Sequence, residues 1–300
     1  MYKKILFYVC AVISIAACSS EELSEEVKGI KIANASIPQI KVIELDTPTR
    51  TSAELTKDNG YLYVKFGYVG NEKIVVFPNI GRPLDWSMKS LSSDKLNATF
   101  TTDAWALREG ATYTAFQPYS DKVINEGTNT AVAVDYTGQS IPKAYLQTQE
   151  IDYLSEYDFQ YAKPLTPTNG TAAFTFNRIN SMLYLKVPYQ NAGEQYTKLE
   201  IVIPENKNAK FTLKGNINLL SGNLTATETS KSFSIELQNI YGTVNSNGKL
   251  TGCYIAMWLA PMTIPAGTKV NLYGSLATKT FTFDNDIPLE SNTFVSKSLK

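Results

Sequence analysis

The sequence of 300 residues contains no histidine, and this absence removes several classes of enzyme chemistry. Histidine is the commonest general base near neutral pH and a usual zinc ligand. Ser-His-Asp and Cys-His catalysis are therefore excluded. Paired carboxylates could still act without histidine, but nothing in the sequence pairs any two of the 28 acidic residues. No glycine-rich phosphate loop is present either. We therefore predict that the protein is not an enzyme and uses no cofactor or metal.

Cysteine and net charge are also scarce. The three cysteines are Cys10, Cys18 and Cys253, and the 28 basic residues balance the 28 acidic ones. Cys10 lies in the apolar N-terminal segment, and Cys253 lies in an apolar stretch where it behaves as a small hydrophobic residue. Stability must then come from packing rather than from disulfides. Because no Lys/Arg cluster appears, we predict no nucleic-acid partner.

The first 17 residues have the composition of a secretory signal peptide. Two lysines precede an apolar run from residue 5 to residue 17, and small residues stand at its end. The run is shorter than the roughly 20 residues of a transmembrane helix. Residues 15–18, Ile-Ala-Ala-Cys, resemble the lipobox of bacterial lipoproteins. That resemblance implies cleavage before Cys18 and a lipid such as palmitate on it, which would anchor the chain to a membrane surface. The alternative is an ordinary signal peptide with a chance cysteine.

An acidic, serine-rich segment follows the cysteine. Residues 19–26 read Ser-Ser-Glu-Glu-Leu-Ser-Glu-Glu, which predicts a solvated tether over residues 18–29. The segment also resembles the acidic signal that sends lipoproteins to the cell surface in Gram-negative gut and oral anaerobes. The expected location is therefore the outer membrane and the cell surface, and a plain linker is the alternative.

The remainder of the chain predicts an all-β fold. Its apolar residues alternate with polar ones in short runs, and Gly, Asn, Asp and Pro stand between the runs, which is typical of antiparallel β-sandwiches. One helical turn is expected in Tyr-Leu-Ser-Glu-Tyr-Asp-Phe, residues 153–159. The predicted strands are residues 61–69, 73–78, 111–119, 130–136, 172–177, 181–189, 198–204, 210–215, 233–239, 252–261, 269–276, 279–284 and 293–300.

Proline and threonine between two strand-rich halves indicate a domain boundary. Residues 162–171 contain two prolines, a glycine and three threonines. We therefore predict an N-terminal sandwich over residues 30–165 and a C-terminal sandwich over residues 166–300. The alternative is one continuous sheet protein with a long loop.

Several stretches, in order, resemble the fimbrillin family of pilin subunits and surface lipoproteins. They are Tyr113–Tyr119, Asp158–Ala162, Ala172–Val187, Tyr254–Gly267 and the C-terminal Ser291–Lys300. The chain departs from the family pattern at two places. Arg178 stands where histidine is usual, and Ser291-Asn292 stand where a glycine is common.

The resemblance implies two tandem transthyretin-like antiparallel β-sandwich domains and a structural or adhesive role in surface fimbriae. It implies a lipid-anchored precursor whose N-terminal strand is removed by an arginine-specific protease. A strand of a neighbouring subunit then fills the vacated groove, which is β-strand addition. Such a head-to-tail contact yields a filament. The implied partners are other fimbrial subunits, the protease, the outer membrane and a host or glycan ligand.

A processing site is expected near the N-terminus. Residues 29–45 include Ile30, Ile32, Ile40, Val42 and Ile43 and are a candidate removable strand, with Pro38 marking an edge or kink. Arg50 follows in a segment rich in threonine and proline. Arg50 is the first of only four arginines. We therefore predict cleavage between Arg50 and Thr51. The alternative is that Arg50 is an ordinary solvated residue.

The same mechanism needs a donor strand, and the C-terminal tail has the required pattern. Ile287, Leu289, Val295 and Leu299 share a parity from residue 286 to residue 300, as expected of a strand with one face in a groove. The alternative is that the tail closes its own second sandwich.

Tryptophan supports a second functional class, a surface lipoprotein that binds glycans. Trp86 and Trp105 lie among turn residues and are candidate sugar platforms, whereas Trp258 lies in an apolar strand and is expected in the core. Large aromatic residues in a sandwich are more often core than binding surface, so the fimbrial subunit is the preferred function.

Overall fold

The structure is a computed structural model, and it describes most of the chain from residue 73 onward together with four strands before it. The described residues are 32–36, 40–44, 55–58, 61–64, 73–79, 81–93, 97–102, 107–108, 110–120, 123–126, 129–142, 152–168, 171–188, 194–241, 243–244, 250–251 and 253–300. The predicted signal peptide and tether, Cys18, the Arg50–Thr51 bond and Trp105 lie outside these residues.

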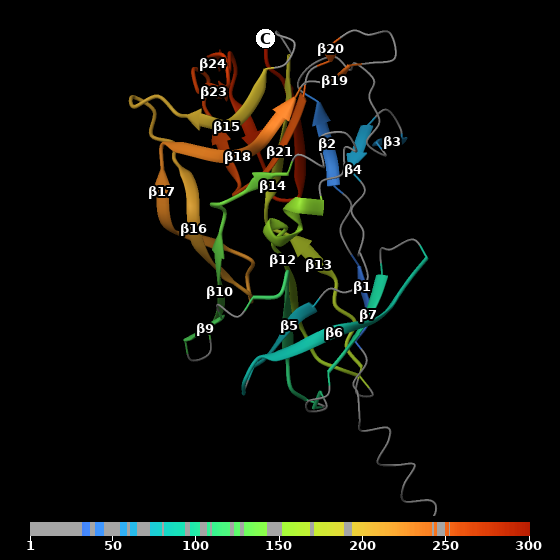
Figure 1. Ribbon diagram of the computed structural model, residues 1–300. Helices are drawn as coiled ribbons and strands as arrows, with labels where there is room; N and C mark the ends of the chain where they lie inside the picture. Colours follow the sequence, from blue (N-terminus) through green and yellow to red (C-terminus); the bar gives the residue numbers. More distant parts are fainter. Residues whose placement is uncertain are drawn as a thin grey trace, which may run out of the picture.

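The described chain is built from β-strands, which confirms the predicted all-β sandwich class (Figure 1). The N-terminal sheet has seven strands, and every pair in it is antiparallel. Its order is β1 (Ile32–Ser36), β7 (Asn97–Thr101), β6 (Leu84–Leu91), β5 (Lys73–Pro78), β8 (Tyr113–Gln117), β12 (Gln160–Leu165) and β13 (Phe176–Arg178).

Both faces of this sheet are covered, because alternate residues of β5 enter different hydrophobic clusters. Ile74 and Val76 pack with Trp86 on one face. Val75 and Phe77 face the other way and join the main core. That second face is covered by a four-stranded sheet of order β17 (Leu224–Ser230), β16 (Phe211–Asn218), β10 (Asn129–Asp135) and β9 (Val123–Glu126).

Two further sheets form a second sandwich. One has the order β11 (Ser140–Ile141), β18 (Ser232–Tyr241), β15 (Gln195–Val202), β23 (Lys269–Gly274) and β24 (Thr278–Thr282). The other has the order β21 (Cys253–Leu259), β14 (Ser181–Val187), β26 (Thr293–Ser298), β2 (Ile40–Glu44), β4 (Tyr61–Val64) and β3 (Leu55–Asp58). Two short pairs complete the described strands, β19 (Thr243–Val244) with β20 (Leu250–Thr251), and β22 (Met262–Ile264) with β25 (Ile287–Leu289).

The inward residues of these two sheets make the main core. Leu199 and Ile201 of β15 meet Leu183 and Leu185 of β14, and all four are fully buried. Burial of each such side chain stabilises the fold by roughly 1.5–3 kcal/mol relative to exposure. The opposite face of β14 is also covered, since Met182 packs with Trp258, Phe294 and Leu154. Leu154 belongs to the short helix η2 (Asp152–Tyr157), which is the helical turn that the sequence predicts.

The strand pairing does not follow the boundary predicted between residues 165 and 166. β13 lies after that boundary but pairs with β12 in the N-terminal sheet. β10 lies before it but pairs with β16, and β2 pairs with β26 near the C-terminus. The two halves of the chain are therefore joined by hydrogen-bonded strands rather than by a single linker. Among the described residues, no helix is long and apolar enough to cross a membrane.

Candidate functional site

The C-terminal strand β26 lies inside a sheet. It pairs in parallel with β14, in a register that sets Met182 opposite Phe294. On its other edge it pairs in parallel with β2, where Val42 lies opposite Phe294. A strand with hydrogen-bonded neighbours on both sides leaves no free edge for another chain. The tail is thus an integral part of its own sandwich in this chain.

The four residues predicted to share one face of the tail do enter the same core. Ile287, Leu289, Val295 and Leu299 are exposed by 1%, 3%, 0% and 4%, and all belong to the main hydrophobic cluster. This arrangement corresponds to the alternative in which the tail closes its own second sandwich. Donation of the tail to a neighbouring subunit stays a prediction, and it requires the release of β26 from β14.

The segment before Arg50 contributes strands to two different sheets. β1 forms the edge of the N-terminal sheet, where Ile32 lies opposite Phe100 of β7. β2 lies between β26 and β4 in the other sandwich, and Lys41 is opposite both Thr293 and Tyr63. Both strands fall within residues 29–45, the segment that the sequence analysis describes as removable. The two strands thus pair with the backbones of β7, β26 and β4.

A buried ion pair stands where the two sandwiches meet. The Nε and Nη2 atoms of Arg178 donate to the two carboxylate oxygens of Asp158, at 2.5 and 2.9 Å. The Arg178 side chain has no exposed surface, and that of Asp158 is 13% exposed. The guanidinium also lies 5.5 Å from the centre of the Trp258 ring, an attractive cation–π arrangement. Bidentate pairing of this kind satisfies a buried arginine while fixing the orientation of both partners.

Asn292 links this ion pair to the C-terminal turn. Its Oδ1 atom accepts a hydrogen bond of 3.0 Å from Nη1 of Arg178, and its backbone N–H donates to the carbonyl of Asn180 at 2.8 Å. The φ angle of Asn292 is +58°, in the left-handed region where glycine and asparagine are favoured. The two departures from the family pattern, Arg178 and Asn292, are therefore in direct contact.

Gln139 closes an edge of the neighbouring sheet with its side chain. Its Oε1 accepts from the backbone N–H of Trp258 at 2.8 Å, and its Nε2 donates to the carbonyl of Trp258 at 2.7 Å. The amide thus pairs with one residue of β21 as a neighbouring strand would. Gln139 is fully buried, so these bonds satisfy groups that have no access to water.

The buried Tyr136 and the partly buried Tyr157 complete the polar groups at this junction. The Tyr136 hydroxyl donates to Oδ1 of Asn180 at 2.9 Å, and burial raises the pKa of Tyr136 well above its ordinary value. Asn180 donates in turn to the Tyr157 carbonyl. Burial, and then the nearby Glu156 carboxylate, raises the pKa of Tyr157 to about 12. Sequence reasoning could not find Gln139 or Asn180, since their partners are distant in the chain and no local pattern marks them.

The prediction that Trp86 is an exposed platform for sugars is wrong. Trp86 has no exposed surface and packs in the hydrophobic cluster of the N-terminal sheet, beside Ile74 and Phe100. A ring without exposed surface cannot stack on a ligand from solvent. Trp258 is fully buried as expected.

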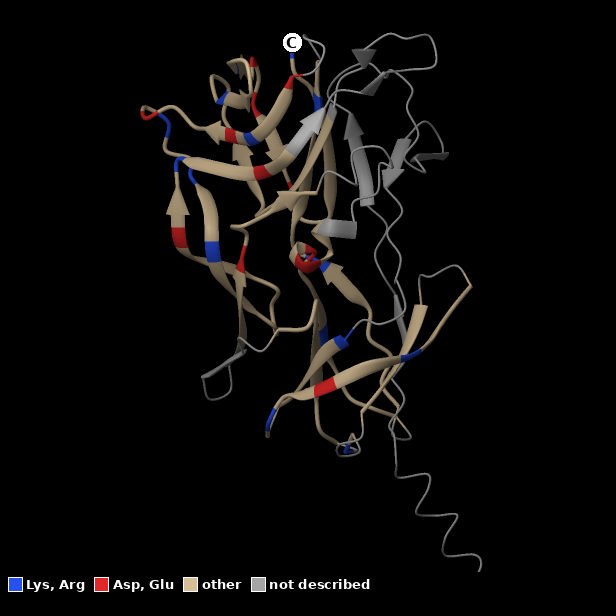
Figure 2. Cartoon of the chain, in the orientation of Figure 1, with Lys and Arg blue, Asp and Glu red and all other residues tan. Residues whose placement is uncertain are grey.

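Charged residues of both signs are scattered along the described part of the chain (Figure 2). Lys214 and Glu228 form an exposed pair, with both side chains about half exposed and a separation of 2.8 Å. Such pairs contribute little to stability. This distribution offers no extended field of one sign to a charged partner.

Both a sequence profile and solved structures are similar to this chain. The sequence profile described as fimbrillin-like matches residues 86–297. Among solved structures, a candidate cell adhesion protein from Bacteroides ovatus is 14% identical, with coverage of 88% of this chain and 92% of its own, and a TM-score of 0.51. A candidate cell adhesion protein from Bacteroides uniformis is 13% identical, with coverage of 82% of this chain and 84% of its own, and a TM-score of 0.45. A fimbrial protein from Bacteroides vulgatus is 13% identical, with coverage of 89% of this chain and 94% of its own, and a TM-score of 0.40.

No curated protein matches the chain. The likeness to the Bacteroides ovatus structure supports the fold alone, because the identity is low. The profile match is stronger evidence, since it spans more than two thirds of the 300 residues. The chain belongs to the fimbrillin-like family.

Proposed function

We propose that this chain is a structural or adhesive subunit of surface fimbriae. The precursor carries a lipid on Cys18, which delivers it to the outer membrane and the cell surface. The support is the family membership, the lipobox-like residues at the N-terminus, and solved relatives described as fimbrial and cell adhesion proteins.

The observation that carries an assembly mechanism is the position of β1 and β2. Both strands precede Arg50, and they cover edges in two different sheets. Cleavage between Arg50 and Thr51 by an arginine-specific protease would free the segment that contains them. Its departure would expose unpaired backbone N–H and C=O groups along β7, β26 and β4. Open edges of this kind accept an extended strand from another chain.

Loss of β2 also changes the state of the C-terminal tail. β26 would keep one hydrogen-bonded neighbour, β14, in place of two. Release of the tail as a donor strand would then break the β14–β26 ladder and the short β22–β25 ladder, but no longer a β2–β26 ladder. In this proposal Ile287, Leu289, Val295 and Leu299 leave their own core and enter the groove of the next subunit. Repetition of this head-to-tail contact produces a filament.

The test compares two arginine variants of the full chain. Arg50→Lys keeps the charge but removes the site of an arginine-specific protease. Arg82→Lys is the matched control, because Arg82 is exposed and lies between β5 and β6. Each protein is treated with the protease, its N-terminus is determined by mass spectrometry, and polymers are separated from monomers by gel electrophoresis without boiling.

Wild type and Arg82→Lys are expected to begin at Thr51 and to form polymers, whereas Arg50→Lys remains uncut and monomeric. In cells, the cut form is expected in sheared surface material and the lipidated form in the membrane fraction. Polymers of Arg50→Lys in wild-type amounts, or polymers whose subunits begin at Cys18, would refute the mechanism.

A further inference from the structure

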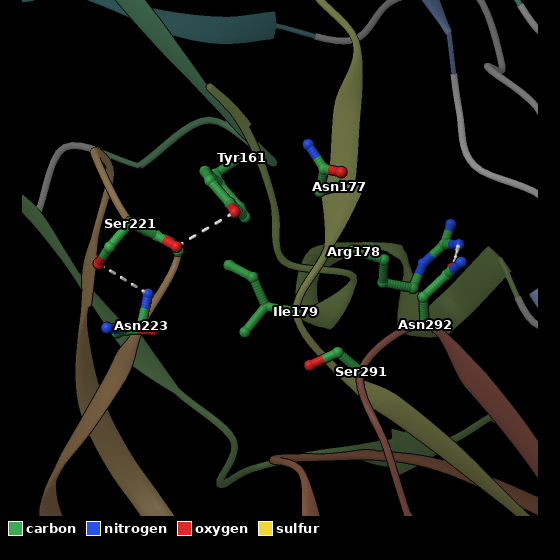
Figure 3. Close-up of a pocket in the computed structure, with 9 residues that line it drawn as sticks. Tyr161, Asn177, Arg178, Ile179, Ser221, Asn223, Ser291 and Asn292 are labelled. Atoms are coloured by element: carbon green, nitrogen blue, oxygen red, sulfur yellow. Dashed lines mark hydrogen bonds between the residues drawn. The ribbon is translucent and has the colours of Figure 1, made fainter. Parts of the chain in front are cut away.

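A hollow of about 400 Å³ opens at the junction of the two sandwiches. Figure 3 shows that four separate segments line it. They are Tyr161 of β12, residues 177–179 at the end of β13, the turn of residues 221–223 between β16 and β17, and Ser291 with Asn292 before β26. The volume is at the small end of the roughly 300–1,000 Å³ of ligand sites in proteins. It suits a small molecule rather than a protein segment.

The groups that face the hollow are mostly neutral and able to form hydrogen bonds. Asn223 and Ser291 are exposed, and the Ser291 hydroxyl points toward the hollow in Figure 3. Ser221 and Asn223 stand on the opposite side, and Asn177 lies above. Amides and hydroxyls can each both donate and accept. Such a lining complements a ligand that carries several hydroxyl groups.

Arg178 is the one charged residue in the lining, and its charge is already compensated. Both carboxylate oxygens of Asp158 accept from it, and Nη1 donates to Asn292. In Figure 3 the guanidinium lies beside Asn292 at the edge of the hollow. An anionic ligand would have to compete with the Asp158 carboxylate, and a cationic ligand would meet no free carboxylate in the lining. The electrostatics therefore favour a neutral ligand.

Two apolar side chains also contribute to the lining. Tyr161 is 8% exposed and Ile179 is 4% exposed, and both lie toward the hollow in Figure 3. The C–H faces of a sugar ring can pack against such surfaces while its hydroxyl groups reach amides and hydroxyls. Small-molecule pockets combine apolar surface with convergent polar groups; here the polar groups predominate, which suits a ligand rich in hydroxyl groups.

The walls are held in place before any ligand arrives. In the 221–223 turn, Oδ1 of Asn218 accepts from the N–H of Leu220 at 2.9 Å and of Ser221 at 3.1 Å. The N–H of Gly222 donates to the Asn218 carbonyl at 2.7 Å. The Tyr161 hydroxyl donates to the Ser221 carbonyl at 3.3 Å and joins the turn to the N-terminal sheet. A fixed wall reduces the entropy lost on binding.

We propose that this hollow binds a neutral saccharide of one or two rings. The ligand would bridge the N-terminal sheet and the two turns of the C-terminal half. The inference names a ligand class for the adhesive role and so rests on the proposed function. Because binding is measured on unassembled chain and polymerisation in a separate assay, failure of one is distinguishable from failure of the other.

The experiment measures sugar binding to the full chain by saturation-transfer NMR and calorimetry. The probes are glucose, galactose, mannose, N-acetylglucosamine and lactose, with N-acetylneuraminic acid as the anionic comparison. Two exposed lining residues are changed together, Asn223→Ala and Ser291→Ala. Asn208→Ala is the control, since Asn208 is exposed in the loop between β15 and β16. Circular dichroism checks that each variant is folded.

At least one neutral sugar is expected to bind saturably. The double variant is expected to weaken that binding about tenfold or more, which is the effect of losing about two net hydrogen bonds, while Asn208→Ala leaves it unchanged. The double variant should also polymerise as the parent does. Three outcomes would each overturn the proposal: no neutral sugar binds at about 10 mM, far above a micromolar dissociation constant; the anionic sugar binds more tightly than every neutral one; or the folded double variant binds like the parent.

Discussion

Replacement of Arg178 by methionine is expected to destabilise the protein far more than the loss of an ordinary surface charge. Methionine keeps an unbranched side chain of similar length but removes the guanidinium. Asp158 then loses both of its hydrogen bonds from Arg178. Asn292 loses the bond of 3.0 Å to Oδ1, and the Trp258 ring loses the cation at 5.5 Å.

The expected magnitude follows from burial. Removal of one partner of a buried ion pair costs about 3–5 kcal/mol, since the remaining charge stays desolvated and uncompensated. Asp158 has 13% of its side chain exposed and still accepts from Nε2 of Gln160 at 2.8 Å. Both features partly compensate the carboxylate. We therefore expect a loss near the lower limit, about 3 kcal/mol in the free energy of unfolding.

Urea titration followed by tryptophan fluorescence measures this loss, because the Trp258 ring is close to the guanidinium. The matched control is Lys214→Met, which breaks the exposed pair with Glu228 and should leave the midpoint unchanged. The double variant Arg178→Met with Asp158→Asn removes both charges, and we expect it to recover most of the stability.

Two results would refute this reasoning. One is a decrease in the free energy of unfolding of less than about 1 kcal/mol for Arg178→Met, which is the contribution expected of an exposed ion pair. The other is a double variant that is less stable than Arg178→Met, since the penalty would then not come from an uncompensated carboxylate.

Three further predictions concern single contacts. Gln139→Ala removes the side chain that pairs with one N–H and one C=O of β21. The free energy of unfolding measured in urea titrations is expected to fall by about 1–3 kcal/mol for each of these groups. Gly222→Ala should lower the thermal midpoint more than Gly110→Ala, although both glycines have positive φ angles. A Cβ atom at Gly222 would lie 2.2 Å from the Tyr161 ring, whereas a Cβ atom at Gly110 would meet nothing within 4 Å. The hydrogen bond from Tyr273 holds the pKa of Glu200 below its ordinary value of 4.5. The resulting stability is present above pH 4.5 and disappears as the pH falls through the lowered pKa, so Tyr273→Phe should be less stable than the parent at pH 7 and equal to it at low pH.

The alternation of apolar residues was sufficient to locate many of the strands. The run at residues 73–78 coincides with β5, and the one at residues 293–300 contains β26. The alternation does not predict the more polar strands β6 and β17, because half or more of their residues are exposed. A period-two pattern is visible only where one face is buried.

For the C-terminal tail, one property could be predicted from the local sequence and another could not. The parity of Ile287, Leu289, Val295 and Leu299 is a local property, and it correctly indicated that all four are buried in one core. The single strand predicted for residues 286–300 is instead divided into β25 and β26, which belong to different sheets. Which groove that face enters depends on β14 and β2, which lie far away in the chain.

Trp86 illustrates the limit of local context. Its neighbours in sequence are turn-forming and polar, yet the N-terminal sheet buries it completely. The contact between Arg178 and Asn292 spans 114 residues, and no local pattern could indicate it. Local alternation was therefore enough to predict the all-β class and many of the buried aliphatic residues. The tertiary structure decided which strands pair, which aromatic residues lose their exposure and where the polar side chains converge, because each of these depends on long-range contacts that a local pattern does not contain.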